Sequence, residues 1–124
     1  SKQPRFLAPL TQADLAHVSA AQARAWVKQS RSGYCRPTDE TAPNDCTHGN
    51  EGVLGLLPQE AVTEVSATRA CLIRCAFCAR CRYISLSRRY GDCSWYSSCN
   101  LARLHQGVAG FTSGIGDRRG LLNV

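Results

Sequence analysis

A cluster of cysteines between Cys71 and Cys99 constrains the fold of this chain more than any other feature. Six of the eight cysteines lie in that stretch, which reads CLIRCAFCARCRYISLSRRYGDCSWYSSC. A domain of 124 residues has a core of limited size, and an even number of cysteines permits complete pairing. We therefore expect structural disulfides that use every cysteine: Cys35, Cys46, Cys71, Cys75, Cys78, Cys81, Cys93 and Cys99.

The residue pattern between these cysteines predicts a helix followed by a hairpin. Ser66 is a good N-cap for a helix in which three cysteines recur at i, i+4 and i+7 and share one face. Those three are Cys71, Cys75 and Cys78. The run 82–87 then alternates as a strand does, and a turn leads to a second strand at 93–96. The expected fold class is α+β, a small disulfide-stapled domain with the helix packed on a short antiparallel hairpin.

The sequence indicates that the cysteines form disulfides more clearly than it indicates which cysteines pair. Sulfurs stacked along one helix face cannot bond to one another, so their partners must lie elsewhere in the chain. Eight cysteines allow many pairings, and spacing does not choose among them. A nested pattern fits a helix lying on a hairpin: Cys71–Cys99, Cys75–Cys93, Cys78–Cys81 and Cys35–Cys46.

Three other uses of the same cysteines compete with this interpretation. Cys71, Cys75, Cys78 and Cys81 contain overlapping CxxC elements, and four thiolates suit a tetrahedral zinc site. The first three also have the spacing of a radical-SAM iron–sulfur cluster, although the chain is too short for the barrel of those enzymes. Cys78 and Cys81 could form a redox-active CxxC pair, but the βαβ surroundings of such a pair are absent.

The segments outside the cluster are assigned from their turn and capping residues. Two prolines in residues 1–10 predict an extended N-terminal arm. The patterns T-x-x-D from Thr11 and S-x-x-Q from Ser19 predict a helix over 12–29 that breaks near Ser19. Residues 31–58 are rich in turn formers, and we expect them to be irregular and anchored by their cysteines.

We divide the chain into an arm, one domain and a tail. The arm is 1–10, the single cysteine-rich domain is 11–107 with its frame at 66–99, and the glycine-rich tail is 108–124. The tail could return to the domain as an edge strand or contact something else, and its sequence does not decide between these.

Charge is unevenly spread along the chain. The net charge is +6, from thirteen arginines, two lysines and nine acids. Six arginines and no acid lie from Arg69 to Arg89, whereas six acids and no base lie from Asp39 to Glu64. Ordinary solvated faces would explain both runs, and steering of a charged partner is the alternative. No nucleic-acid recognition motif is present, so we expect no nucleic-acid partner.

Cysteine content and the first residue both bear on the compartment. Abundant cysteines favour an oxidising compartment outside the cytosol, either an organelle lumen or the cell exterior. The chain contains no methionine, even at position 1, so we expect either that a targeting segment was removed or that the chain was trimmed. No apolar run reaches the roughly 18 to 20 residues that span a bilayer, so we expect no transmembrane segment.

The pattern C-x3-C-x2-C-x2-C-R-Y-I-S-x-S, followed by D-C-S-W-Y-x2-C, resembles a cysteine-rich module of predicted microalgal proteins. The resemblance covers residues 71–99 and implies an accessory subunit on the lumenal side of an algal photosynthetic membrane complex, in the thylakoid lumen. Cysteines on a helix followed by a strand are also loosely similar to PAN/apple domains, which bind proteins or sugars. That second resemblance implies a secreted binding module.

No serine, histidine and acid constellation or phosphate-binding loop stands out, so we expect neither an enzyme nor a cofactor. The expected function is that of a structural or interaction protein, a small accessory subunit that docks on a larger assembly. A secreted binding module and a zinc-binding cluster are the alternatives. The candidate partner contacts are apolar side chains of the arm and tail together with arginines: Phe6, Leu7, Leu10, Arg80, Arg82, Arg88, Arg89 and Phe111.

The aromatic residues of the cluster have two possible roles. Trp95 shares a strand face with Cys93, and we expect it to be buried against the disulfides with its ring nitrogen bonded to one acceptor. Alternatively, Trp95 could lie outside with Tyr83 as a platform on which a ligand stacks. Tyr90 and Tyr96 would then extend an aromatic binding face.

Overall fold

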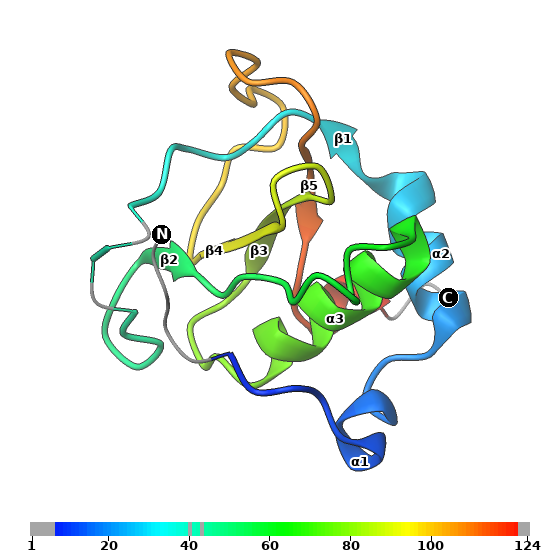
Figure 1. Ribbon diagram of the computed structural model, residues 1–124. Helices are drawn as coiled ribbons and strands as arrows, with labels where there is room; N and C mark the ends of the chain where they lie inside the picture. The colour runs from blue at the N-terminus through cyan, green and yellow to red at the C-terminus, as the bar shows by residue number, and fades with distance from the viewer. Residues whose placement is uncertain (1–6, 40, 43, 122–124) are drawn as a thin grey trace.

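An antiparallel sheet with helices on one face forms the centre of the computed structural model, which describes residues 7–39, 41–42 and 44–121 (Figure 1). The strands are β1 (Arg31–Ser32), β2 (Glu51–Val53), β3 (Tyr83–Ser87), β4 (Asp92–Tyr96) and β5 (Thr112–Ile115), in the spatial order β1-β5-β3-β4-β2. The helices are α1 (Gln12–Leu15), α2 (Ala20–Gln29), α3 (Glu64–Ala76) and α4 (Arg118–Leu121). The expected class, a small disulfide-stapled α+β domain, is confirmed.

Two capping boxes divide the N-terminal helix as the sequence indicated. The Thr11 hydroxyl accepts from the Asp14 N–H at 3.1 Å, and the Ser19 hydroxyl accepts from the Gln22 N–H at 3.0 Å. Each box satisfies backbone donors that the first turn of a helix leaves free. The predicted break near Ser19 is therefore confirmed, with α1 before it and α2 after it.

The cysteine-bearing helix begins and ends earlier than predicted. Its N-cap is Thr63, and Ser66 occupies the third helical position of a capping box with Thr63. The helix ends at Ala76, so Cys78 lies beyond it and does not continue the stripe of Cys71 and Cys75. The predicted cap at Ser66 is wrong because a second capping residue stands three positions before it.

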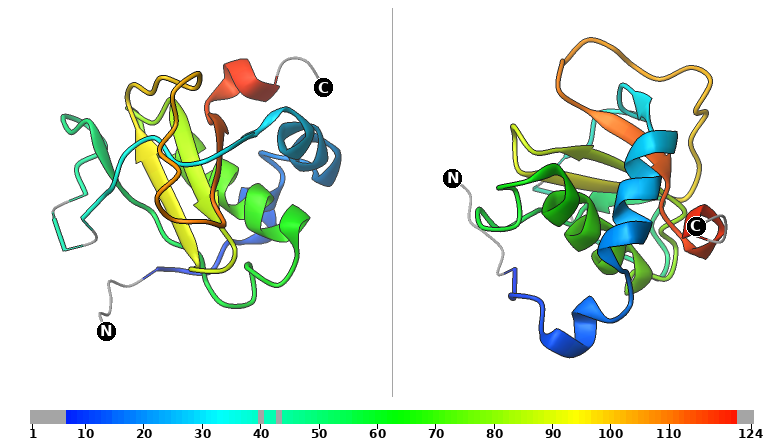
Figure 2. Two further views of the ribbon diagram at one scale, coloured as in Figure 1. Left: turned by 90° about the horizontal axis from the view of Figure 1, so that it is seen from above. Right: turned by 90° about the vertical axis from the view of Figure 1, so that its right-hand side faces the viewer.

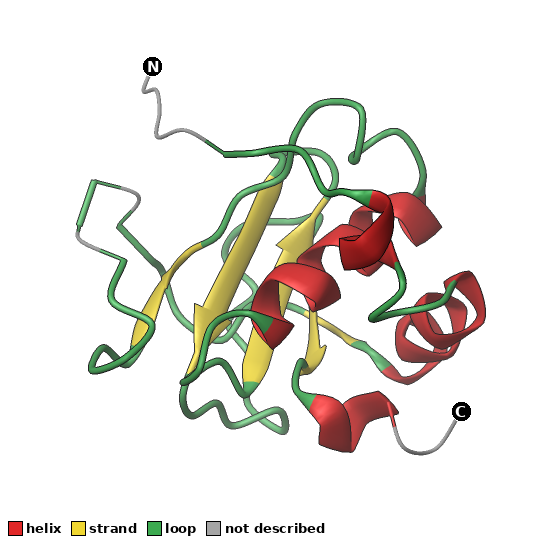
Figure 3. Ribbon diagram, turned by 90° about the horizontal axis from the view of Figure 1, so that it is seen from below, coloured by secondary structure: helices red, strands yellow, loops and turns green. Residues whose placement is uncertain are grey.

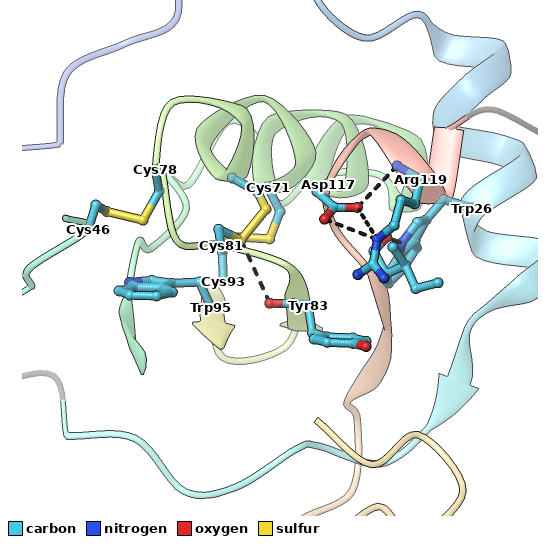
Figure 4. Close-up of a disulfide and its surroundings, with 12 residues drawn as sticks. Trp26, Cys46, Cys71, Cys78, Cys81, Tyr83, Cys93, Trp95, Asp117 and Arg119 are labelled. Carbon is cyan, nitrogen blue, oxygen red and sulfur yellow. Dashed lines mark hydrogen bonds and ion pairs between the residues drawn. A yellow bond between two sulfur atoms is a disulfide. The ribbon is translucent and has the colours of Figure 1, made fainter. Parts of the chain in front are cut away.

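The predicted hairpin is confirmed, and so is the burial of its tryptophan. β3 pairs with β4 in a register that places Ile84 opposite Trp95. Trp95 is 0% exposed, and its ring N–H donates to the side-chain oxygen of Asn44 at 2.6 Å. Because no part of Trp95 reaches the surface, the alternative in which it forms a ligand platform with Tyr83 is wrong. Figure 4 shows Trp95 near Cys93 at the strand beneath α3.

The four disulfides are Cys35–Cys99, Cys46–Cys78, Cys71–Cys93 and Cys75–Cys81. All eight cysteines are oxidised, as expected, but the nested pairing is wrong in each of its four bonds. Cys93 faces α3 and reaches Cys71 (Figure 4). Cys99 lies three residues after the end of β4 and reaches Cys35. Because Cys78 lies after the helix, it can bond to the irregular segment through Cys46.

The tail returns to the domain as an inner strand rather than an edge strand. β5 pairs with β3 on one side and with β1 on the other. The Trp26 ring N–H of α2 donates to the Ile115 carbonyl at 2.8 Å, which fixes α2 against the end of β5 (Figure 4). A Cβ at Gly114 would lie 3.0 Å from the Trp26 ring, so this close approach favours glycine.

Helices cover one face of the sheet, and irregular segments cover the other (Figures 2 and 3). On the second face Ser85 and Ser113 are fully buried, and their hydroxyls hydrogen-bond to each other at 2.7 Å. The Cys35 N–H donates to Ser85, and Ser113 donates to the Gly33 carbonyl at 2.8 Å. Serines on this face thus provide the hydrogen bonds that a buried loop requires.

Among the helices of the described residues, none combines the length and apolar character that a membrane crossing requires. The four disulfides indicate an oxidising environment outside the cytosol, because cytosolic thiols are kept reduced.

Replacing Thr68 by valine should raise the free energy of unfolding by about 1 kcal/mol. Thr68 lies in α3 at 0% exposure, and its hydroxyl oxygen has no hydrogen-bond partner within the described residues. Valine has nearly the same shape and removes the buried polar group. Urea denaturation with the disulfides intact measures the change, and a loss of stability would show that the hydroxyl has a partner in solution.

Candidate functional site

The face of β4 opposite α3 forms the floor of an aromatic pocket. Successive side chains of a strand point to opposite faces, so Cys93 and Trp95 face the helix while Asp92, Ser94 and Tyr96 face the other way. The pocket on that side has a volume of about 390 Å³. Its apolar walls are six side chains from several segments: Tyr34, Pro37, Tyr90, Tyr96, Val108 and Phe111.

The aromatic rings of this pocket form a contiguous cluster. The Phe111 ring lies 5.4 Å from the Tyr34 ring and 5.9 Å from the Tyr90 ring, and it is nearly parallel to the latter. Tyr34 also stacks on His105 at 5.5 Å. Tyr90 is 54% exposed and Val108 is 43% exposed. The cluster therefore presents apolar ring surface to solvent at one side while its other side rests on the sheet.

The polar groups of the pocket floor are hydrogen-bonded to one another. Ser94 donates to Asp92 at 2.8 Å, and Thr38 and Ser94 share a hydrogen bond of 2.9 Å. The Arg36 guanidinium donates to Glu51 at 2.9 Å. These hydrogen bonds hold the floor in one arrangement, and the terminal N–H groups of Arg36 make no hydrogen bond to the described residues.

Tyr96 is the deepest ring of the pocket. It is almost fully buried, and its hydroxyl donates to the Arg36 carbonyl at 2.6 Å. Burial raises the pKa of the Tyr96 phenol above its ordinary value, so the hydroxyl remains a donor at neutral pH. The Arg36 guanidinium lies 5.0 Å from the ring centre, a cation–π distance.

One disulfide and one pair of backbone hydrogen bonds hold the irregular walls in place. Cys35 bonds to Cys99, which follows β4 in the chain. Tyr34 and His105 exchange backbone hydrogen bonds at 3.1 and 2.9 Å. The segment after β1 and the segment before β5 are thereby fixed against each other over the sheet, as Figure 2 shows. The pocket is a preformed feature of the fold.

The predicted apolar partner contacts have different positions in the structure. Phe111 lines the aromatic pocket. Leu10 packs against the hydrophobic core, and Leu7 lies beside Gly55. Phe6 lies outside the described residues. Of the three that the structure describes, only Phe111 lines the aromatic pocket.

The four arginines predicted to contact a partner also differ in their positions and partners. Arg80 donates to the Gly49 carbonyl at 2.6 Å and to the Asn50 side chain at 2.8 Å, and Arg88 donates to the carbonyls of Ala61 and Val62. These two link loops of the domain itself. Arg82 is exposed beside the start of β3. Arg89 lies next to the aromatic pocket, with its guanidinium 5.5 Å from the Tyr90 ring centre.

The four cysteines of the zinc alternative belong to three disulfides. Cys75 is bonded to Cys81, while Cys71 and Cys78 are bonded to partners outside the set. A zinc site at these residues would therefore need all three bonds to be reduced first. Residues 7–39, 41–42 and 44–121 contain no other group of histidines, cysteines and acids that could hold a metal ion.

Sequence reasoning placed Tyr90 and Tyr96 in one possible aromatic binding face and named Phe111 separately as a partner contact, but it missed Tyr34. The feature that could have indicated Tyr34 is its position directly before Cys35. The disulfide partner of Cys35 determines where the Tyr34 ring lies. Without the Cys35–Cys99 bond, nothing in the sequence brings Tyr34 to Phe111.

Comparison of the chain with protein-family models, with curated proteins and with solved structures finds no match.

Proposed function

We propose that this protein is a non-enzymatic binding domain, a small accessory subunit that docks on a larger assembly through the aromatic pocket. The observation that carries this proposal is the exposed apolar surface of Tyr90 and Val108, beside the half-buried Phe111, on a preformed pocket. Exposed aromatic clusters on rigid supports are typical of interaction sites, where tyrosine buries a large area at a low cost in conformational entropy.

The resemblance of residues 71–99 to the microalgal module suggests the setting. An accessory subunit on the lumenal side of an algal photosynthetic complex is compatible with four disulfides, and so is a secreted binding module. The two settings differ in what the native protein is bound to, which fractionation of the source cells measures directly.

Replacing Tyr90 by alanine should weaken docking by at least about 10-fold, because a ring at the centre of an interface commonly contributes more than about 1.4 kcal/mol. The measurement is size-exclusion chromatography of an extract from cells that express the tagged chain. We expect the unaltered chain to elute with an assembly far larger than 13.5 kDa and the variant to shift toward the free mass.

Phe77→Ala is the matched control for Tyr90→Ala. Phe77 is also an aromatic residue of similar exposure, 55% against 54%, but it lies at the end of α3, where it contacts His17 instead of the aromatic pocket. Equal shifts in the two variants would contradict docking through the pocket. Elution of the unaltered chain as a free species would contradict the subunit proposal itself.

A further inference from the structure

We infer that the aromatic pocket binds an extended, proline-containing segment of a partner protein, with an acidic residue next to the prolines. This inference depends on the proposed function for the location of the binding surface, and it adds the chemical nature of the bound segment. Three properties of the pocket carry it: the hydrogen bonds already made on its floor, the groups that stay free, and the charge at its rim.

The hydroxyl groups of the floor are already engaged within the protein. Ser94 donates to Asp92, Thr38 is bonded to Ser94, and Arg36 donates to Glu51 through its Nε alone. A sugar loses hydrogen bonds to water when it binds, and each must be replaced or the buried group is left unsatisfied. The pocket instead favours a ligand that has an apolar body and few donors of its own.

The donors that remain free among the described residues are two phenolic hydroxyls and the terminal N–H groups of Arg36. Within the described residues the hydroxyls of Tyr34 and Tyr90 make no hydrogen bond, and both tyrosines line the pocket. The Tyr34 hydroxyl lies close to Gly107, which precedes Val108 of the pocket wall. Phenolic hydroxyls at the edge of an apolar surface are suited to donate to carbonyl oxygens of a ligand.

A proline-containing segment complements this combination. Proline has an apolar ring and no backbone N–H, so such a segment presents carbonyl acceptors and few donors. It also adopts the extended polyproline conformation before binding, which reduces the entropy lost on association. Aromatic-lined grooves recognise segments of this kind by stacking on their rings and donating to their carbonyls.

The positive charge of Arg89 beside the pocket favours an acidic residue next to the prolines of the partner. The Arg89 guanidinium lies over the Tyr90 ring, and no carboxylate pairs with it in the part of the chain that the structure describes. Asp92 is the only carboxylate among the described residues that line the pocket, and it already accepts a hydrogen bond from Ser94. An acidic residue in the partner would therefore meet a free positive charge, in agreement with the net charge of +6.

Titration of the purified full chain with three synthetic peptides of equal length tests the inference. The first contains six prolines with one central glutamate, the second has lysine in place of the glutamate, and the third has alanine in place of every proline. We expect the first to bind at least about 10-fold more tightly than the third and about 3-fold more tightly than the second. Chemical shifts or calorimetry measure the dissociation constants.

Two variants assign the effects to the groups named above. Tyr90→Ala should weaken binding of the first peptide by at least about 10-fold, and Phe77→Ala should leave it unchanged. Arg89→Gln should abolish the preference for glutamate over lysine while proline binding persists. Both positions are on the surface, so unfolding does not confuse the result, and a circular dichroism spectrum of each variant verifies this.

The other outcomes separate this inference from the proposed function. Binding of an oligosaccharide such as chitotriose or cellotriose without binding of the proline peptides would overturn the inference. If none of the peptides binds but Tyr90→Ala still releases the chain from its assembly, the inference fails while the proposed function stands. If Tyr90→Ala affects neither measurement, both fail.

Discussion

Replacing Trp95 by alanine should lower the free energy of unfolding by about 3 to 5 kcal/mol, the range for a large buried aromatic side chain. Trp95 is completely buried, and its ring N–H is bonded to Asn44, so the variant loses packing and leaves the Asn44 oxygen without its donor. A domain of this size has a total stability of roughly 5 to 15 kcal/mol, and the loss would remove a large part of it. Urea denaturation followed by the fluorescence of Trp26 measures the change.

Trp95→Phe is the control for this experiment. Phenylalanine keeps an aromatic ring in the core and loses the N–H bond to Asn44, so we expect a smaller loss of about 1 to 2 kcal/mol. A variant Trp95→Ala that unfolds at the same urea concentration as the unaltered chain would contradict the core that the structure describes.

Removing the Cys35–Cys99 disulfide by alanine substitution should cost about 4 kcal/mol, because it closes a loop across a sequence separation of 64 residues. The same treatment of Cys75–Cys81, which has a sequence separation of only 6, should cost about 2 kcal/mol. Cys35, Cys75 and Cys81 are buried and Cys99 is half-buried, so the difference between the two double variants reports mainly the length of the loop. Denaturation of both variants gives the comparison.

Only the first of these double variants should loosen the aromatic pocket. Cys35 follows Tyr34 directly, and its backbone N–H is bonded to Ser85 beneath the pocket. Amide hydrogen exchange of residues 33–38 should become faster in Cys35→Ala/Cys99→Ala than in Cys75→Ala/Cys81→Ala. Equal exchange in the two would mean that the backbone hydrogen bonds alone hold the pocket wall.

Local sequence patterns predicted α1, α2 and the β3–β4 hairpin, but not β1 and β2, which lie in the segment 31–58 that was expected to be irregular. The capping boxes of Thr11 and Ser19 and the alternation of residues 82–87 each depend on neighbours within a few positions, so the sequence displays them directly. Trp95 was predicted as buried because its spacing from Cys93 fixed the face on which it lies. The fold class followed from these local elements and from the number of cysteines.

Features that join distant residues could not be predicted in the same way. The disulfide pairing depends on where α3 ends and on which side of the sheet the chain passes after β4, and neither is visible in cysteine spacing. The aromatic pocket combines rings from separate segments, and a ring's neighbours are known only when the loops are placed.

The roles of the arginines between Arg69 and Arg89 also could not be predicted from the sequence. Steering of a partner and simple solvation were the two expectations, yet Arg69 donates to the carbonyls of Val18 and Leu15 at 2.5 and 2.8 Å. Arg74 forms a buried pair with Glu60 at 2.5 Å. Several of these arginines thus supply hydrogen bonds to loops and helix ends, a use that leaves no pattern in the sequence because a carbonyl acceptor is present at every residue.

The position of β5 between β1 and β3 determines the order in which the protein can assemble during synthesis. β3 and β4 leave the ribosome before β5, so one edge of β3 stays unpaired until residues 112–115 are made. An open strand edge is a template for pairing with other chains, and a partly made chain of this topology therefore carries an aggregation risk that the finished one does not. The hydrogen bond of the Trp26 ring N–H also forms only after this strand is made, because its acceptor is the carbonyl of Ile115. Until β5 is in place, one edge of β3 and the ring N–H of Trp26 therefore lack the partners that they have in the complete fold.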